Sequence, residues 1–177
     1  RCELSSIRIL GENLRADGSV LLTAVEWAIE QRFHLVNLSL STRRAEHKER
    51  LHDLTNQAYF SGTTIVAAAH NSPVQSYPWR FCSVISVGSH AVPEPEYLEL
   101  NPEPPVEFFA SGVGVTVPWT GGGTSRVSGN SFAAPHVTGL CARVLGEHSR
   151  FGTAELKHVL GAIANNHSAD HLVEEPT

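Results

Sequence analysis

The chain has 177 residues, the length of a single domain. Its 13 Lys and Arg against 18 Asp and Glu give a formal net charge of −5. With 41% hydrophobic and 18% charged residues, the composition excludes a disordered, collagen-like or coiled-coil chain. The acidic balance argues against nucleic acid and anionic membrane surfaces as partners, because binding either requires a dense positive face. No apolar run reaches the roughly 18 residues that a transmembrane helix needs.

Cysteine usage and the start of the chain give further expectations. The cysteines, Cys2, Cys82 and Cys141, are odd in number and form no C-x-x-C pair. This favours free thiols over a disulfide framework or a zinc ribbon, with one bridge as the alternative. The sequence opens at Arg1 without Met or an apolar leader, so no signal peptide is expected and the start is typical of a cut inside a longer protein. The cellular compartment stays unassigned.

The first half of the chain alternates between strand and helix patterns. Residues 4–10 alternate around two isoleucines, which predicts a strand. A polar loop then leads to Ser19, the expected N-cap of a helix whose apolar face covers residues 21–29. A short apolar strand is predicted at 35–40 and an amphipathic helix at 43–60.

The second half continues this alternation. Residues 63–69 are β-branched and small, which is typical of a strand covered on both faces, and 83–89 resemble it. Residues 91–107, rich in Pro and Glu, are expected to form a surface connection, and 112–117 a strand. Helices alternating with buried strands predict a parallel sheet with right-handed crossovers. The remaining predicted elements are a glycine turn at 121–123 and helices at 132–145 and 154–163.

A serine stands at the join between a glycine-bearing loop and an apolar helix. Residues 129–139 read GNSFAAPHVTG, with Ser131 at the helix start. The free N–H groups and positive end of a helix favour negative charge developing beside a nucleophile. A plain N-cap serine is the alternative. An α/β-hydrolase elbow, G-x-S-x-G, would require glycine where Ala133 stands.

This string resembles the nucleophile motif of the subtilisin-like serine peptidases, the subtilases, which usually reads G-T-S-M-A-A-P-H-V-A-G. Asn130, Phe132 and Thr138 replace the family's Thr, Met and a small residue. The resemblance implies that Ser131 is the acylating nucleophile of a serine endopeptidase. It also implies that His136 is not the catalytic base.

A second stretch resembles the family strand V-V-V-A-A-A-G-N. Residues 63–71 read TTIVAAAHN, so Asn71 matches the asparagine that donates to the oxyanion of the tetrahedral intermediate. The resemblance places Ala69 and His70 among the substrate-binding positions, with His70 in place of a glycine. The alternative is that Asn71 simply ends a strand and begins a turn toward Pro73.

A third stretch, residues 36–41 (VNLSLS), resembles the family's V-I-N-M-S-L-G. In the family this segment binds the substrate backbone as an added strand and forms one wall of the primary pocket. The matching positions are Ser39, Leu40 and Ser41, the last in place of a glycine. Larger side chains at Ser41 and His70 predict a narrowed pocket, with a preference for small or unusual side chains or weak activity. The alternative is that the His70 ring turns away from the pocket and does not narrow it.

A subtilase needs Asp, His and Ser in that chain order. The D-[ST]-G and H-G-T-H-V-A-G motifs that carry the first two are absent from these 177 residues. The resemblance therefore implies the later part of a catalytic domain over 1–164, lacking its N-terminal portion, and a polar tail over 165–177. Asp and His are expected from an upstream segment or a second chain. Because a serine without a base is a weak nucleophile, the chain alone is expected to be a poor peptidase.

The implied fold is α/β, with three layers (α/β/α) around a mainly parallel sheet. The expected partner is a peptide or protein substrate, and the chemistry requires no cofactor. Calcium is implied by the family alone, and no metal ligand is predicted. Residues 167–171 (HSADH) have i, i+4 histidines, for which a solvated tail is the favoured interpretation over a metal site. The competing function is a catalytically inactive domain of the same fold that binds a peptide or partner segment.

Overall fold

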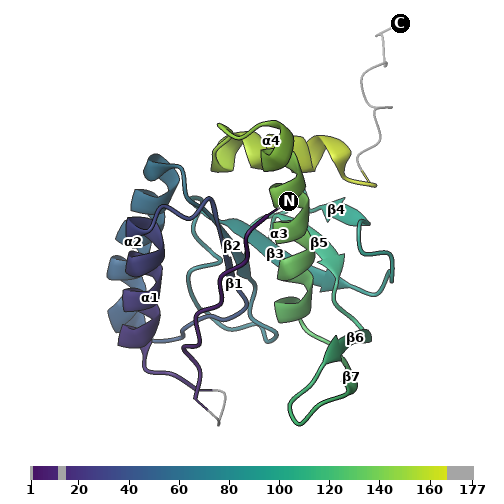
Figure 1. Cartoon of the computed structure of the whole chain (residues 1–177), viewed down its shortest axis with the longest axis horizontal. Coiled ribbons are helices and arrows are strands. Elements are labelled where there is room, and N and C mark those ends of the chain that lie inside the picture. Colours follow the sequence, from purple (N-terminus) through teal and green to yellow (C-terminus); the bar gives the residue numbers. More distant parts are fainter. Residues whose placement is uncertain (1, 12–14, 167–177) are drawn as a thin grey trace, which may run out of the picture.

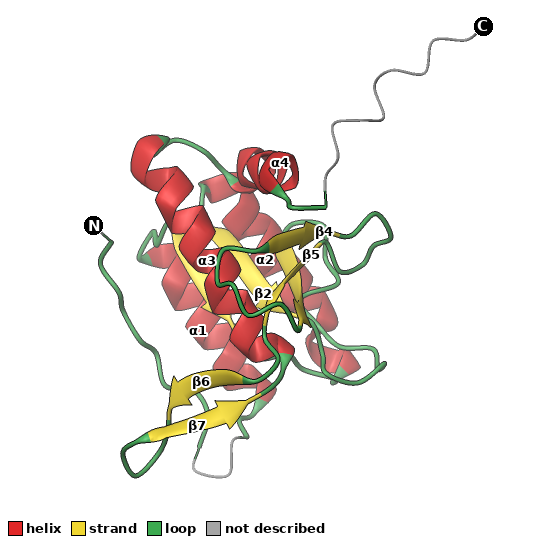
Figure 2. Cartoon of the chain, turned by 90° about the vertical axis from the view of Figure 1, so that its right-hand side faces the viewer, coloured by secondary structure: helices red, strands yellow, loops and turns green. Residues whose placement is uncertain are grey.

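The computed structural model describes residues 2–11 and 15–166. A five-stranded sheet lies between two helical layers, which confirms the predicted three-layer α/β architecture (Figure 1, Figure 2). The helices are α1 (Gly18–Glu30), η1 (Ala45–His47, a 3₁₀ turn), α2 (Lys48–Ser61), α3 (Asn130–Glu147) and α4 (Thr153–Ile163). The strands are β1 (Leu35–Leu38), β2 (Thr64–Ala68), β3 (Ile85–His90), β4 (Leu98–Leu100), β5 (Phe108–Ser111), β6 (Val115–Pro118) and β7 (Thr124–Val127).

The strand order of the main sheet is β1-β2-β3-β5-β4. The first four strands in this order run parallel, and β4 is antiparallel to β5 at the edge. Parallel strands bring the segments after their carboxyl ends to one edge of the sheet. The segments after β1 and β2 therefore meet beside the start of α3.

Each face of the sheet has its own core. The side chains of Val66 and Ala68 face α3 and α4, whereas Ile65 and Ala67 face α1 and α2. All five residues of β2 are buried, as expected for a strand covered on both faces. This double burial holds the end of β2, from which residues 69–71 continue, in a fixed place.

The structure corrects two expectations near the start of the chain. Residues 4–10 are not a strand, and the side chain of Leu4 is 92% exposed. Alternation favours a strand where a neighbour is present to pair with, and this segment has no pairing partner among the described residues. The N-cap of α1 is Asp17, whose carboxylate accepts a hydrogen bond from the Ser19 backbone N–H at 2.9 Å. Ser19 is therefore inside the helix.

The region predicted as a Pro-rich connection and one strand contains three strands. Residues 91–107 contain β4, and β5 follows before the glycine at 112. The expected strand at 112–117 begins at Val115 and is half of the β6–β7 hairpin, which projects from the body (Figure 2). The predicted glycine turn lies in this hairpin, with φ of +84°, +89° and +85° at residues 121–123. Strands as short as three or four residues carry too little periodicity to be recognised from sequence.

The predicted tail begins inside the fold. Asn165 hydrogen-bonds to the backbone of Leu98 in β4, and Asn166 to the backbone of Leu100, at 2.7 to 2.8 Å. These two residues are therefore ordered against the sheet, and the rest of the tail lies outside the described residues.

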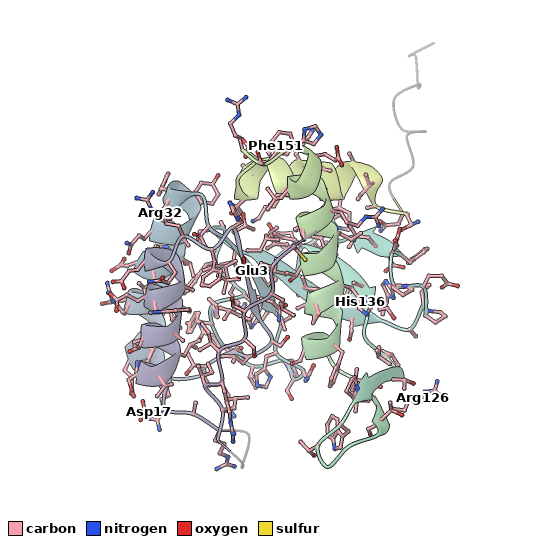
Figure 3. All side chains as sticks on the ribbon, viewed as in Figure 1. Glu3, Asp17, Arg32, Arg126, His136 and Phe151 are labelled. Carbon is pink, nitrogen blue, oxygen red and sulfur yellow. The ribbon has the colours of Figure 1, made fainter. Side chains whose placement is uncertain are left out.

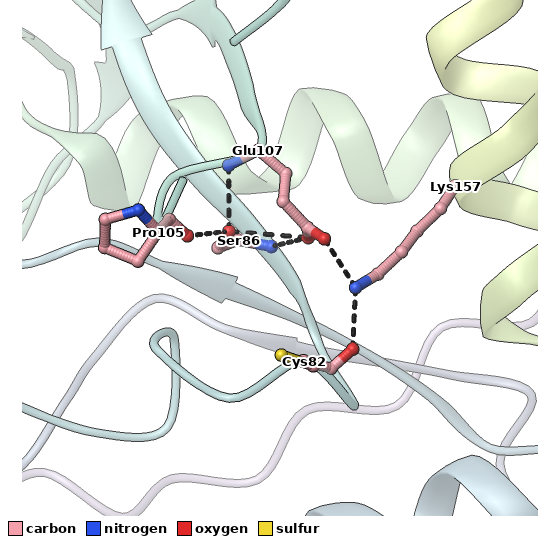
Figure 4. A network of polar contacts seen from close by, with 5 residues as sticks. All are labelled: Cys82, Ser86, Pro105, Glu107 and Lys157. Atoms are coloured by element: carbon pink, nitrogen blue, oxygen red, sulfur yellow. Dashed lines mark hydrogen bonds and ion pairs between the residues drawn. The ribbon is translucent and has the colours of Figure 1, made fainter. Parts of the chain in front are cut away.

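A polar network fastens α4 to the sheet (Figure 4). Lys157 Nζ donates to Glu107 Oε1 at 2.6 Å and to the Cys82 carbonyl at 2.8 Å. The other oxygen of Glu107 accepts from the Ser86 backbone N–H at 3.1 Å. The Ser86 hydroxyl donates a hydrogen bond to the Pro105 carbonyl at 2.8 Å. This network ties α4 to β3 and to the segment that enters β5.

All three cysteines are free thiols, as predicted. Cys141 is fully buried on α3, and burial raises the pKa of its thiol to about 12. It serves as a small apolar residue in the core between α3 and the sheet.

Candidate active site

A cavity of about 440 Å³ opens at the carboxyl edge of the sheet. It gathers the segment after β1, the segment after β2, the start of α1 and the first turn of α3. All seven residues predicted from sequence as catalytic or substrate-binding line it: Ser39, Leu40, Ser41, Ala69, His70, Asn71 and Ser131. Residues up to 92 positions apart in the chain therefore share one site.

The local backbone places Ser131 at the second position of α3. The residue before the helix, Gly129, has φ of +153°, a conformation that residues with a side chain rarely adopt. Its N–H donates to the Gly112 carbonyl at 2.8 Å, which joins the loop to the end of β5. Ala133 and Ala134 are fully buried against the sheet, so the helix approaches it closely.

Ser39 and Ser131 hold each other by two hydrogen bonds. The Ser131 hydroxyl donates to the Ser39 carbonyl at 3.0 Å, and the Ser39 hydroxyl donates to the Ser131 carbonyl at 2.8 Å. Pro135, four residues on in α3, has no N–H to offer the Ser131 carbonyl in the usual helical pattern. The Ser39 hydroxyl therefore supplies the donor that this proline removes.

The side-chain amide of Asn71 contacts the turn at the start of α3. Its Oδ1 accepts a hydrogen bond from the Asn130 backbone N–H at 2.9 Å. A Cβ built on Gly129 would lie 3.2 Å from Asn71 Nδ2 and 3.4 Å from Oδ1, so the whole amide lies against this glycine. Stabilisation of an oxyanion requires a preorganised N–H beside the reacting serine, which is the role predicted for Asn71.

Asn130, identified from sequence only as a departure from a motif, joins three segments. Its Nδ2 lies 3.1 Å from the Ala69 carbonyl and 3.3 Å from that of His70, and its Oδ1 accepts from the Ser89 hydroxyl at 2.8 Å. The start of α3 is thus bonded to the ends of both β2 and β3. An amide next to the nucleophile in the sequence was the available signal for this role.

The imidazole of His70 makes a bond within its own turn. His70 Nδ1 lies 3.0 Å from the Ser72 backbone nitrogen and 3.2 Å from the Ser72 carbonyl oxygen. His70 and Ser41 both line the cavity, and the cavity persists beside them. The structure therefore does not show the primary site closed by these two larger residues.

Among the described residues, the titratable groups of the cavity wall are Arg15, Asp17 and His70. The backbone N–H and hydroxyl of Ser19 hold the pKa of the Asp17 carboxyl below its usual range. His136, which lies on α3 beyond Ser131 (Figure 3), does not line the cavity. Burial, and then the nearness of His90, lowers the pKa of its imidazole. In the described part of the chain, the Ser131 hydroxyl has a carbonyl and not a histidine as its acceptor.

Two further expectations concern metals and membranes. Among residues 2–11 and 15–166, no three side chains of His, Cys, Asp or Glu gather closely enough to hold a metal ion. The histidines at 167 and 171 lie outside the described residues. No helix in the described part of the chain has the length and apolar character needed to cross a membrane.

Comparison with known proteins identifies the family. The sequence pattern of the Subtilase family matches residues 1–175. The chain is 27% identical to subtilisin DY of Bacillus licheniformis over 169 residues, which covers 92% of this chain and 61% of that protein. It is 31% identical over 144 residues to the minor extracellular protease Epr of Bacillus subtilis, covering 79% of this chain and 22% of that one.

A solved structure shows the same fold. A cold adapted subtilisin-like serine proteinase superimposes with a TM-score of 0.74 at 24% identity, over 92% of this chain and 61% of that one. The chain thus spans less than two thirds of subtilisin DY and of this structural neighbour. With a family match along almost its whole length, the chain belongs to the subtilase family.

Proposed function

We propose that this chain is the nucleophile-bearing part of a subtilisin-like serine endopeptidase that hydrolyses peptide bonds through an acyl-enzyme on Ser131. The observation that supports it most directly is that Asn71 and Ser131 line one cavity and that Asn71 is hydrogen-bonded to the residue before Ser131, at the first turn of α3. The chain's relatives include proteins named as proteases, which fits the same activity.

In the proposed reaction, Ser131 Oγ attacks the scissile carbonyl carbon while a base takes its proton. Asn71 Nδ2 and the N–H groups at the start of α3 stabilise the resulting oxyanion. The C–N bond then breaks, the leaving amine takes the proton from the conjugate acid of the base, and an ester remains on Ser131. Attack by water on this ester releases the second product and restores the hydroxyl.

The segment Ser39–Ser41 is proposed to bind the substrate backbone. It follows β1 directly and lines the same cavity as Ser131. Just beyond it, Thr42 and Tyr77 exchange two backbone hydrogen bonds of 2.8 and 2.9 Å, which anchors the segment at its far end. An extended peptide or protein substrate can add to such a segment by main-chain hydrogen bonds.

The catalytic Asp and His are proposed to come from an upstream segment or a second chain. Two observations support a complementing segment. In the described residues β1 pairs with β2 alone and has an unpaired edge, and residues 4–10 pass without pairing to any strand. An unpaired parallel edge is a ready template for another strand.

The second candidate is a domain of the same family that binds a peptide and does not cut it. It is favoured by the contact that the Ser131 hydroxyl makes, because a hydroxyl that donates to a carbonyl has not been activated by a base. The two candidates are separated by hydrolysis of a peptide ester by the full gene product. The peptidase predicts a rapid first turnover that is lost in Ser131→Ala, and the binding domain predicts equal, negligible hydrolysis by both.

A further inference from the structure

A chain of side-chain hydrogen bonds connects the middle of α3, through β1, to the backbone of the nucleophile. Thr138 Oγ1, on α3, lies 3.1 Å from Asn37 Oδ1 on β1. Asn37 Nδ2 donates to the Ser39 hydroxyl oxygen at 3.0 Å. The Ser39 hydroxyl then donates to the Ser131 carbonyl at 2.8 Å. We refer to Thr138, Asn37 and Ser39 as the β1 relay.

The direction of the relay follows from its last acceptor. The carbonyl of Ser131 can only accept, so the single proton of the Ser39 hydroxyl points to it. The Ser39 oxygen is then left with lone pairs toward Asn37, which must present its NH₂ group. This leaves Asn37 Oδ1 facing Thr138, whose hydroxyl proton is shared with the Ala134 carbonyl at 2.9 Å. One arrangement of the protons therefore accounts for all four contacts.

The end of the relay is the backbone group that most needs a donor. Pro135 deprives the Ser131 carbonyl of its usual i+4 helical donor, and the Ser39 hydroxyl donates to this carbonyl instead. The direction of the carbonyl sets the orientation of the first peptide units of α3, and with them the Ser131 side chain. A small displacement of a reacting group costs a large factor in rate.

We propose that Asn37 is a positioning residue which, with Thr138, holds the Ser39 hydroxyl on the Ser131 carbonyl and so fixes the nucleophile turn. This inference rests on the proposed peptidase function. Thr138 stands where the subtilase motif has a small residue, so the motif itself does not provide the outer end of the relay. Asn37 is exposed on β1, and its side-chain amide contacts Thr138 and Ser39.

The test uses near-isosteric substitutions of the relay residues in the full gene product. Asn37→Asp keeps the shape of the side chain but turns its NH₂ into an acceptor, toward which the Ser39 hydroxyl then rotates. The expected result is a fall of about 10- to 100-fold in the maximal rate of Ser131 modification by a fluorophosphonate, with the half-saturating probe concentration unchanged. Thr138→Val removes only the outer hydroxyl and should lower this rate less. Asn56→Asp, at a half-buried position of α2 outside the relay, makes the same substitution and should leave the rate unchanged.

A restoring variant separates positioning from general damage. Ser39→Ala should lower the maximal rate at least as much as Asn37→Asp, and Ser39→Thr, which keeps a hydroxyl, should restore most of it. Equal maximal rates for the wild type, Asn37→Asp and Thr138→Val would overturn the proposal. So would a loss of rate that follows a fall in melting temperature in every variant.

A spectroscopic readout keeps the inference distinct from the peptidase function. The carbonyl carbon chemical shift of Ser131 reports its hydrogen bond without any reaction. This shift should move in Asn37→Asp and Ser39→Ala and stay at its wild-type value in Asn56→Asp. If the wild-type protein proves unreactive, the peptidase proposal fails while a moved shift still supports the relay. An unmoved shift in Asn37→Asp overturns the relay whatever the reactivity.

Discussion

The backbone N–H of Asn130 donates a hydrogen bond to Asn71 Oδ1 at 2.9 Å, across 59 residues of chain. Because this bond uses the acceptor end of the Asn71 amide, its donor end, Nδ2, points in a different direction from the bond. The same bond joins the end of β2 to the start of α3. The orientation of the proposed oxyanion donor is therefore set by the backbone next to Ser131.

Asn71→Leu should remove the oxyanion donor while leaving the fold intact. Loss of such a donor typically lowers turnover by about 100- to 1,000-fold. Asn71 is exposed, so the melting temperature should change little. The measurement is kcat and KM for a peptide substrate of the full gene product, with Gln57→Leu on the exposed face of α2 as the control. A kcat within about threefold of the wild type would exclude Asn71 from this role.

Gly129→Ala should damage both stability and activity. The added Cβ meets Asn71 Nδ2 at 3.2 Å, and φ of +153° strains any residue with a side chain. Such strain costs on the order of 1 to 3 kcal/mol. Displacement of the amide should also slow the reaction at Ser131.

Gly139→Ala is the matched control, because it lies in the same helix and an added Cβ there meets nothing within 4 Å. It should be neutral or stabilising by about 0.5 to 1 kcal/mol. Urea unfolding of both variants measures the difference. Equal stability of the two variants would show that Gly129 has no special conformational role.

Lys157→Met should loosen α4 from the sheet. Lys157 Nζ bonds Glu107 and the Cys82 carbonyl, and the two side chains of the ion pair are only 20% and 29% exposed. Hydrogen bonds to charged groups contribute about 1.5 to 3 kcal/mol, so a loss in this range is expected on thermal or urea unfolding. Lys48→Met, at the exposed lysine over the Tyr77 ring, should cost about 1 kcal/mol or less. A smaller effect at Lys157 than at Lys48 would contradict this account.

His136 should make the protein sensitive to acid. Burial, and then the proximity of His90, lowers its pKa in the folded state below the ordinary value of 6.5. The unfolded chain therefore binds the proton more tightly, and the free energy of unfolding falls as the pH drops below about 6.5 and through the folded-state pKa. His136→Gln should flatten this dependence between pH 7 and pH 5, whereas His158→Gln, at an exposed position of α4, should leave it. Parallel stability profiles for all three proteins would refute the assignment.

Much of the site was predictable because its residues follow strands whose apolar sequence patterns predict that they are buried. The unbroken β-branched and small run before Asn71 predicts the buried strand β2, which lies between β1 and β3, and the apolar run before Ser39 predicts β1. Parallel strands bring their carboxyl ends together. The motif at Ser131 then placed the nucleophile beside both.

What sequence could not predict depends on contacts between segments far apart. The strand expected at residues 4–10 required a partner that is not among the described residues. The roles of Asn130 and Asn37 lie in hydrogen bonds to residues between 41 and 101 positions away, except for the bond from Asn37 to Ser39. Only the folded geometry shows which polar side chain meets which backbone group.

The most direct measurement is the mass of the protein after reaction with a fluorophosphonate, with the modified peptide located by tandem mass spectrometry. In the full gene product, we predict one adduct on Ser131, absent from Ser131→Ala, and little adduct on the 177-residue chain alone because a serine without a base is a weak nucleophile. A full gene product that stays unmodified at Ser131, while a known serine peptidase reacts fully under the same conditions, would contradict the proposed peptidase function.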